Sequence, residues 1–187
     1  MKPVLFFLFL LIFSGLPGID VVSLKKQKAI IDSRLLHDQK SIIAFAKVPH
    51  KKELIKVKNN KWPDEVEYSY NILKDSANNI IMILQGPFSE SGDWDISYIH
   101  YFDKAGKTFA FERRTNFFNS ECTEGAAYEV VSNYYQDNFT KVDQTYKLTN
   151  KQGKSLAKSK CNFPYDFKYT IYKNVSECLK AYHINLE

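Results

Sequence analysis

The sequence predicts an α+β domain: an antiparallel meander sheet of about five to seven strands, with an N-terminal helix, a middle helix and a short C-terminal helix. Strand-like segments follow one another through short turn sequences, and strands joined by tight turns must be antiparallel. Aromatic residues make up 15% of the chain, which favours strands. Only seven glycines and six prolines are present, so we expect no extended disorder.

A short apolar leader precedes this domain. Lys2 supplies one positive charge, residues 4–13 are all apolar, and Ser-Gly-Leu-Pro-Gly follows. This order is typical of a secretory signal peptide, and the run is too short for a membrane-spanning helix. We therefore expect a signal peptide over 1–18, a single domain over 19–187, and a secreted or periplasmic protein. An uncleaved N-terminal membrane anchor is the alternative.

Three cysteines follow the leader: Cys122, Cys161 and Cys178. In an oxidising compartment this odd number permits one disulfide and one free thiol, or an intermolecular bridge. The sequence leaves all three pairings open. We expect one structural disulfide and a buried third thiol.

The N-terminal helix is predicted over 23–46, where apolar residues recur at spacings of four and seven. Ser23 is its expected N-cap. The alternative is a helix that breaks near Asp38 and is followed by a strand over 41–48.

Two further helices are expected. Residues 120–135 predict the middle helix, with Thr123 as N-cap and apolar residues on one face. Asn174-Val-Ser-Glu resembles a capping box, which predicts a short C-terminal helix through Tyr182.

The strands are predicted from alternation of apolar and polar residues and from turn sequences between them. Two tight turns, beginning at Asp103 and Asn150, both place a glycine at the fourth position and predict hairpins. The expected strands are 54–57, 66–72 and 80–84, followed by the hairpins 94–102/108–117 and 140–148/155–161.

The register of the first hairpin stays open. The turn at Asp103 predicts that Ile99 lies opposite Phe111. Apolar clustering favours a one-residue slip, with Tyr98 opposite Phe111, which exchanges the faces of one strand. In both registers an arginine lies opposite Ile96.

The candidate binding residues lie on this hairpin: Trp94, Tyr98, His100, Glu112, Arg113 and Arg114. Because Arg113 and Arg114 point to opposite faces, one guanidinium faces a covered side and needs a carboxylate or a ligand anion. The functional interpretation is an anion-recognising pocket lined by Trp94, Tyr98 and His100. The alternative is a core histidine with satisfied hydrogen bonds beside an ion pair between Asp95 and Arg114.

Recognisable catalytic motifs are missing from the sequence. It contains no Gly-x-Ser-x-Gly elbow, no phosphate-binding glycine loop and no closely spaced pair of histidines. We therefore assign no catalytic residue, no cofactor and no metal.

Positive charge is concentrated near the N-terminus. Residues 24–61 contain eleven basic and three acidic side chains, a net +8, whereas residues 62–187 carry 14 basic and 17 acidic ones, a net −3. The basic segment is either a solvated face or a site for an anionic partner.

These patterns predict an exported, non-catalytic binding or interaction module. Its expected partner is a protein, a glycan or an anionic surface, and not nucleic acid. Contact with a membrane is expected only through an uncleaved leader or the basic segment. One alternative is a hydrolase-like enzyme in which His100, Glu112 and an arginine meet on the hairpin. The other is a structural envelope protein held by its leader.

Overall fold

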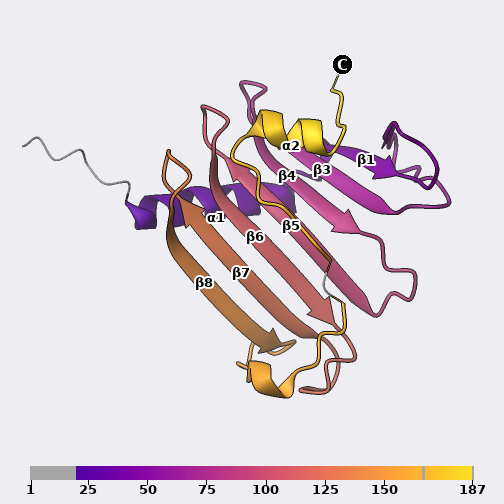
Figure 1. Ribbon diagram of the computed structural model, residues 1–187, viewed down its shortest axis with the longest axis vertical. Coiled ribbons are helices and arrows are strands. Elements are labelled where there is room, and N and C mark those ends of the chain that lie inside the picture. The colour runs from indigo at the N-terminus through magenta and orange to yellow at the C-terminus, as the bar shows by residue number, and fades with distance from the viewer. Residues whose placement is uncertain (1–19, 166, 187) are drawn as a thin grey trace, which may run out of the picture.

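The computed structural model describes residues 20–165 and 167–186, so the predicted signal peptide lies outside the described residues. Eight strands form one antiparallel sheet in the order β2-β1-β3-β4-β5-β6-β7-β8, accompanied by helices α1 and α2 (Figure 1). The strands are β1 (Ile42–Lys47), β2 (Ile55–Lys56), β3 (Tyr68–Lys74), β4 (Ile80–Pro87), β5 (Trp94–Phe102), β6 (Thr108–Phe117), β7 (Ala127–Tyr135) and β8 (Lys141–Asn150).

The predicted α+β class and meander topology are confirmed, with eight strands in place of five to seven. The predicted middle helix is wrong, because its second half is strand β7. β-branched and aromatic residues such as Val130, Val131 and Tyr134 favour a strand, and here pairing with β6 and β8 decides the outcome.

Helix α1 (Val21–His37) is shorter than the predicted 23–46, and the alternative with a break near Asp38 is confirmed. Its N-cap is Asp20, whose carboxylate accepts a hydrogen bond of 3.0 Å from the Val22 N–H, so the assignment of Ser23 as the cap is wrong. After a short 3₁₀ turn the chain enters β1, whose residues pair with β3.

Four tight turns of the meander have the same hydrogen bond between the C=O of the first residue and the N–H of the fourth. The fourth residues all have positive φ: Asn78 (68°), Gly106 (74°), Phe139 (65°) and Gly153 (77°). The predicted turns at Asp103 and Asn150 are among them. The predicted strand 155–161 is wrong, since only Ser155 bridges to β8 before a 3₁₀ helix (Lys158–Lys160) begins.

Neither predicted register of the β5–β6 hairpin is correct beyond the turn. Phe102 lies opposite Thr108, as the turn predicts, but a bulge next to Tyr101 then shifts the pairing by one residue. His100 therefore lies opposite Phe111 and Tyr98 opposite Arg113. Ile96 lies opposite Thr115, so the expectation of an arginine there is wrong.

The sheet is covered on both faces. We call the side that contacts α1 the helix face; there Leu24 and Ile31 pack against Leu73, Met82 and Tyr101. In Figure 1, α1 lies behind the sheet, and the C-terminal part of the chain lies in front of it.

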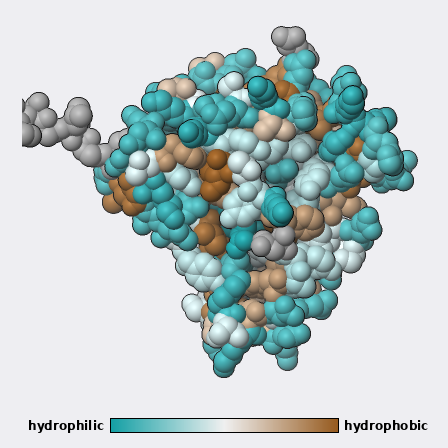
Figure 2. Space-filling model, viewed as in Figure 1, coloured by the Kyte–Doolittle hydropathy of each residue, from teal (hydrophilic) through white to brown (hydrophobic). Residues whose placement is uncertain are grey.

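The opposite face is covered by a segment without strand pairing, which we call the strap (residues 161–165 and 167–173). Its apolar side chains alternate and pack on β5 and β6, for example Phe163 on Phe117 and Tyr169 on Tyr98. Viewed from this strap face, hydrophilic residues predominate and hydrophobic residues gather in small separate areas (Figure 2). Helix α2 (Val175–Ala181) continues the cover over Tyr70 and its neighbours.

The C-terminal predictions are confirmed. A disulfide joins Cys122, after β6, to Cys161 at the start of the strap, and Cys178 is a buried free thiol on α2. The Asn174 side chain accepts a hydrogen bond of 2.9 Å from the Glu177 N–H and caps α2.

The basic segment is divided between two regions of the fold, helix α1 and the sheet edge at β2. The five lysines at the β2 edge are all exposed: Lys51, Lys52, Lys56, Lys58 and Lys61. Within residues 20–165 and 167–186, no helix combines the length and hydrophobicity needed to cross a membrane.

Candidate functional site

The sheet separates the six residues that the sequence suggested as a site. Trp94, Tyr98, His100 and Arg113 face the strap, whereas Glu112 and Arg114 face helix α1. This division follows from the observed register, because side chains alternate between faces along a strand. The six residues therefore do not form one site.

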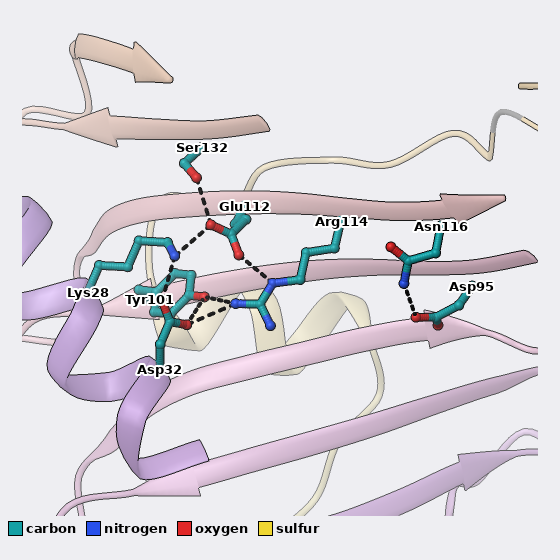
Figure 3. A network of polar contacts seen from close by, with 8 residues as sticks. All are labelled: Lys28, Asp32, Asp95, Tyr101, Glu112, Arg114, Asn116 and Ser132. Atoms are coloured by element: carbon teal, nitrogen blue, oxygen red, sulfur yellow. Dashed lines mark hydrogen bonds and ion pairs between the residues drawn. The ribbon is translucent and has the colours of Figure 1, made fainter. Parts of the chain in front are cut away.

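On the helix face, Glu112 and Arg114 belong to a network anchored by helix α1 (Figure 3). The Lys28 ammonium lies 2.6 Å from Glu112 and 2.7 Å from Asp32. The Arg114 guanidinium lies 2.5 Å from Glu112 and 3.0 Å from Asp32, and the Tyr101 hydroxyl donates to Asp32 at 2.7 Å. Burial, followed by the nearby Glu112 carboxylate, raises the pKa of Tyr101 well above its ordinary value.

Two positive and two negative side chains balance in this network, and the Glu112 carboxylate also accepts a 2.6 Å bond from Ser132. Lys28 is only 6% exposed, so its charge is partnered by protein groups in place of water. The predicted pair between Asp95 and Arg114 is wrong, because Asp95 accepts a 3.1 Å bond from Asn116 (Figure 3). The arrangement is that of a structural clamp between α1 and the sheet.

On the strap face, the candidate residues Arg113 and Tyr98 line a cavity of about 280 Å³. The Glu129 carboxylate, 2% exposed, accepts bonds from Arg113 at 2.8 Å, Lys158 at 2.6 Å and Tyr146 at 3.0 Å. The carboxylate that the sequence argument required is therefore Glu129, from β7. The segment containing it was predicted to be a helix, which concealed the pairing.

Trp94 and His100 do not line this cavity, but Trp94 lines the larger depression described below. His100 is fully buried among aromatic rings, and its Nε2 accepts a 3.0 Å bond from the Tyr172 N–H. Burial lowers its pKa to about 3, so the imidazole is neutral. Its Nδ1 has no hydrogen-bond partner among the described residues. His100 is a core residue that holds the strap.

A larger depression, about 600 Å³, opens on the helix face beside the part of the sheet that α1 covers. Its floor is formed by alternate residues of three adjacent strands: Ser69, Asn71, Leu84, Gly86, Asp95 and Ser97. Two large exposed rings line it, Trp62 (45% exposed) and Phe88 (54% exposed). Exposed rings beside a concave polar floor are typical of a binding surface.

A second depression, about 750 Å³, adjoins the first and shares Asp64, Val66, Pro87 and Phe88 with it. We call the two together the groove. Among the described residues, no lysine or arginine lines either depression. The described carboxylates that line the groove are five: Asp64, Glu65, Glu67, Glu90 and Asp95. The groove is thus locally acidic in a chain whose net charge is +5.

Sequence reasoning missed Trp62 and Phe88 as functional candidates. Trp62-Pro63 was interpreted only as a boundary, and Gly86-Pro87 as a strand end. One sequence feature could have identified them. Trp62 stands next to Pro63 before β3, and Phe88 stands next to Pro87 after β4, so neither ring belongs to the alternating pattern of a strand. Among the described residues, no group of three or more His, Cys, Asp or Glu side chains is placed to hold a metal ion.

Comparison of the chain with protein-family models, with curated proteins and with solved structures gives no match. The function therefore has to be inferred from the site.

Proposed function

We propose that this protein is an exported, non-catalytic binding module that holds a basic, extended segment of a partner protein in the groove. Export rests on the predicted leader. The observation that carries the binding proposal is the groove itself, where the described lining residues include two exposed aromatic rings and five carboxylates but no lysine or arginine.

The chemistry of the groove selects the charge of its ligand. Arginine and lysine side chains bind carboxylates through charge-assisted hydrogen bonds and also stack on aromatic faces, so Trp62 and Phe88 suit the same side chains as Asp64 and Asp95. The net charge of +5 opposes any general attraction of a basic ligand. Binding of a basic peptide would therefore be due to the local charge of the groove and not to the net charge of the protein.

An extended ligand fits better than a compact one. The two depressions share four lining residues, and the second reaches the strap at Phe167, so together they continue from the floor at Ser97 on the helix face towards the strap face. Side chains of an extended segment can then occupy both depressions in turn.

The hydrolase-like alternative receives no support from the geometry. His100 lies on the strap face, whereas Glu112 and Arg114 lie on the helix face, where both are engaged in the clamp with Lys28. The alternative of an anchored envelope protein depends on the leader, which lies outside the described residues.

The test uses a fluorescent peptide of alternating arginine and leucine, compared with glutamine–leucine and glutamate–leucine peptides of the same length. We expect the basic peptide to bind most tightly, with an affinity that falls as salt is added. Phe88→Ala and the double variant Asp64→Asn/Asp95→Asn should each weaken binding about tenfold, since such contacts contribute on the order of 1 kcal/mol or more.

Matched controls exist outside the groove. Phe118 is 56% exposed and lines neither depression, so Phe118→Ala should leave binding unchanged, as should Glu124→Gln at another exposed site. Equal binding of the three peptides, or equal effects of Phe88→Ala and Phe118→Ala, would contradict the proposal.

A further inference from the structure

The two edges of the sheet differ in how far they are protected against pairing with another strand. The β2 edge is a strand of two residues, Ile55–Lys56, surrounded by exposed lysines. The β8 edge is a strand of ten residues without proline, Lys141–Asn150. Short strands and lysines are common protective features of sheet edges, and β8 is long enough to act as a template for pairing.

Within the described part of the chain, only the end of β8 has a backbone partner on its outer side. The Leu156 N–H donates to the Leu148 C=O at 3.0 Å, which shows that Leu148 directs its backbone groups outward. Alternate residues of an antiparallel strand point the same way, so Gln144 and Tyr146 also present N–H and C=O groups outward, whereas the bulge at Val142 ends this alternation. No strand of the described residues pairs with them.

The sequence of β8 is complementary to itself in one antiparallel register. With Thr145 opposite the partner's Thr145, Gln144 lies opposite the partner's Tyr146, and all these backbone groups can pair. The same register places Asp143 opposite the partner's Lys147, and Lys147 opposite the partner's Asp143.

Neighbouring registers of the same strand pair are less favourable, because they place like charges opposite each other. A shift of two residues in one direction places Lys141 opposite the partner's Lys147, and a larger shift the same way places two Asp143 side chains opposite each other. Like charges directly opposite each other destabilise a strand pair. A shift in the other direction meets the part of β8 that Leu156 already occupies.

We propose that two copies of this chain associate through their β8 strands, antiparallel, about a two-fold axis at Thr145. The two sheets become one continuous sheet, and the paired segment is limited to residues 143–147 of each copy. Because this interface is small, the dimer is weak and depends on protein concentration. The groove floor belongs to β3, β4 and β5, so ligand binding there and dimer formation are independent.

The register is tested by cysteine cross-linking. Thr145 is exposed, and the described cysteines are either bonded to each other or buried, so Thr145→Cys adds a single accessible thiol. Under mild oxidation we expect a disulfide-linked dimer, because opposing residues of a non-hydrogen-bonded pair lie close together. Gln144→Cys is the matched control, since its opposite residue in this register is tyrosine.

Two further variants test the interface by sedimentation velocity over a range of concentrations. Tyr146→Pro removes an outward N–H and should abolish dimer formation while leaving the monomer folded. Lys147→Glu should weaken the dimer at least tenfold. Adding Asp143→Lys together with Lys25→Glu, which reverses the Lys25–Asp143 pair without removing it, should restore the dimer. A monomer at all concentrations, a dimer insensitive to Tyr146→Pro, or faster cross-linking of Gln144→Cys than of Thr145→Cys would each overturn the proposal.

Discussion

Lys28 of α1 and Glu112 of β6 form an ion pair of 2.6 Å although the two residues are only 6% and 3% exposed. The pair connects the N-terminal helix to the centre of the sheet across more than 80 residues of sequence. Asp32 and Arg114 complete the network and balance its charge. Each charged group of the network depends on the others, because removal of one leaves its partners buried without a compensating charge.

Removal of the Lys28 ammonium should therefore be strongly destabilising. Lys28→Met leaves the Glu112 carboxylate buried with only Arg114 and Ser132 as partners, and we expect the free energy of unfolding to fall by about 3 kcal/mol. Urea denaturation followed by circular dichroism measures this change.

Lys25 on the same helix provides the control. It pairs with Asp143 at 2.7 Å, but its side chain is 43% exposed. Lys25→Met should cost less than about 1 kcal/mol. Similar losses for the two variants would show that the buried network does not hold α1 in place.

The buried His100 predicts a specific pH dependence of stability. Its pKa in the folded protein is about 3, below the value near 6.5 expected in the unfolded chain, so the unfolded chain binds the proton first as pH falls. The stability from neutral His100 is complete above pH 6.5 and is lost progressively towards pH 3. At pH 5 the loss amounts to about 2 kcal/mol.

His100→Gln should remove this pH-dependent contribution to stability, because glutamine does not titrate and can still accept a hydrogen bond from the Tyr172 N–H. The difference in unfolding free energy between pH 7 and pH 5 should be smaller in the variant by about 2 kcal/mol. An unchanged pH dependence would mean that His100 is not the titrating group.

The disulfide should contribute substantially to stability. Cys122 and Cys161 are 39 residues apart, and closing a loop of this length stabilises a fold by about 4 kcal/mol in the chain-entropy treatment. We expect the double variant Cys122→Ser/Cys161→Ser to lose most of this amount in chemical denaturation.

Thiol labelling gives an independent check of the pairing. Burial raises the pKa of the Cys178 thiol, so the native protein should not react with a thiol reagent, and one thiol per chain should appear after unfolding without reductant. Labelling of Cys122 or Cys161 in the unfolded, unreduced protein would contradict the pairing.

The sequence was most informative where local chemistry determines structure. The turns at Asp103 and Asn150, the cap at Asn174 and the short strand near Ile55 all follow from residues close together in the chain. The sequence was least informative where contacts with residues distant in the chain determine the secondary structure. Residues 127–135 have helical spacing as well as strand composition, and only the neighbours β6 and β8 distinguish the two.

The candidate site shows the same limit. One bulge next to Tyr101 changes the partner of every residue further along the hairpin, and no local signal marks it. The arginine on the covered side, Arg113, was expected to need a carboxylate, but its partner Glu129 comes from a segment assigned to a helix. The groove was missed because its residues come from five separate segments of the chain.

The strap also constrains when the protein can fold. The aromatic surface of β5 and β6 is covered by the strap, which follows all eight strands in the sequence, and Tyr182 completes the cover over Tyr70. During synthesis, all eight strands are complete before the strap has been made, so this aromatic surface has no segment to pack against. A chain truncated before the strap would expose this apolar surface, so we expect the sheet to fold stably only once the strap has been synthesised.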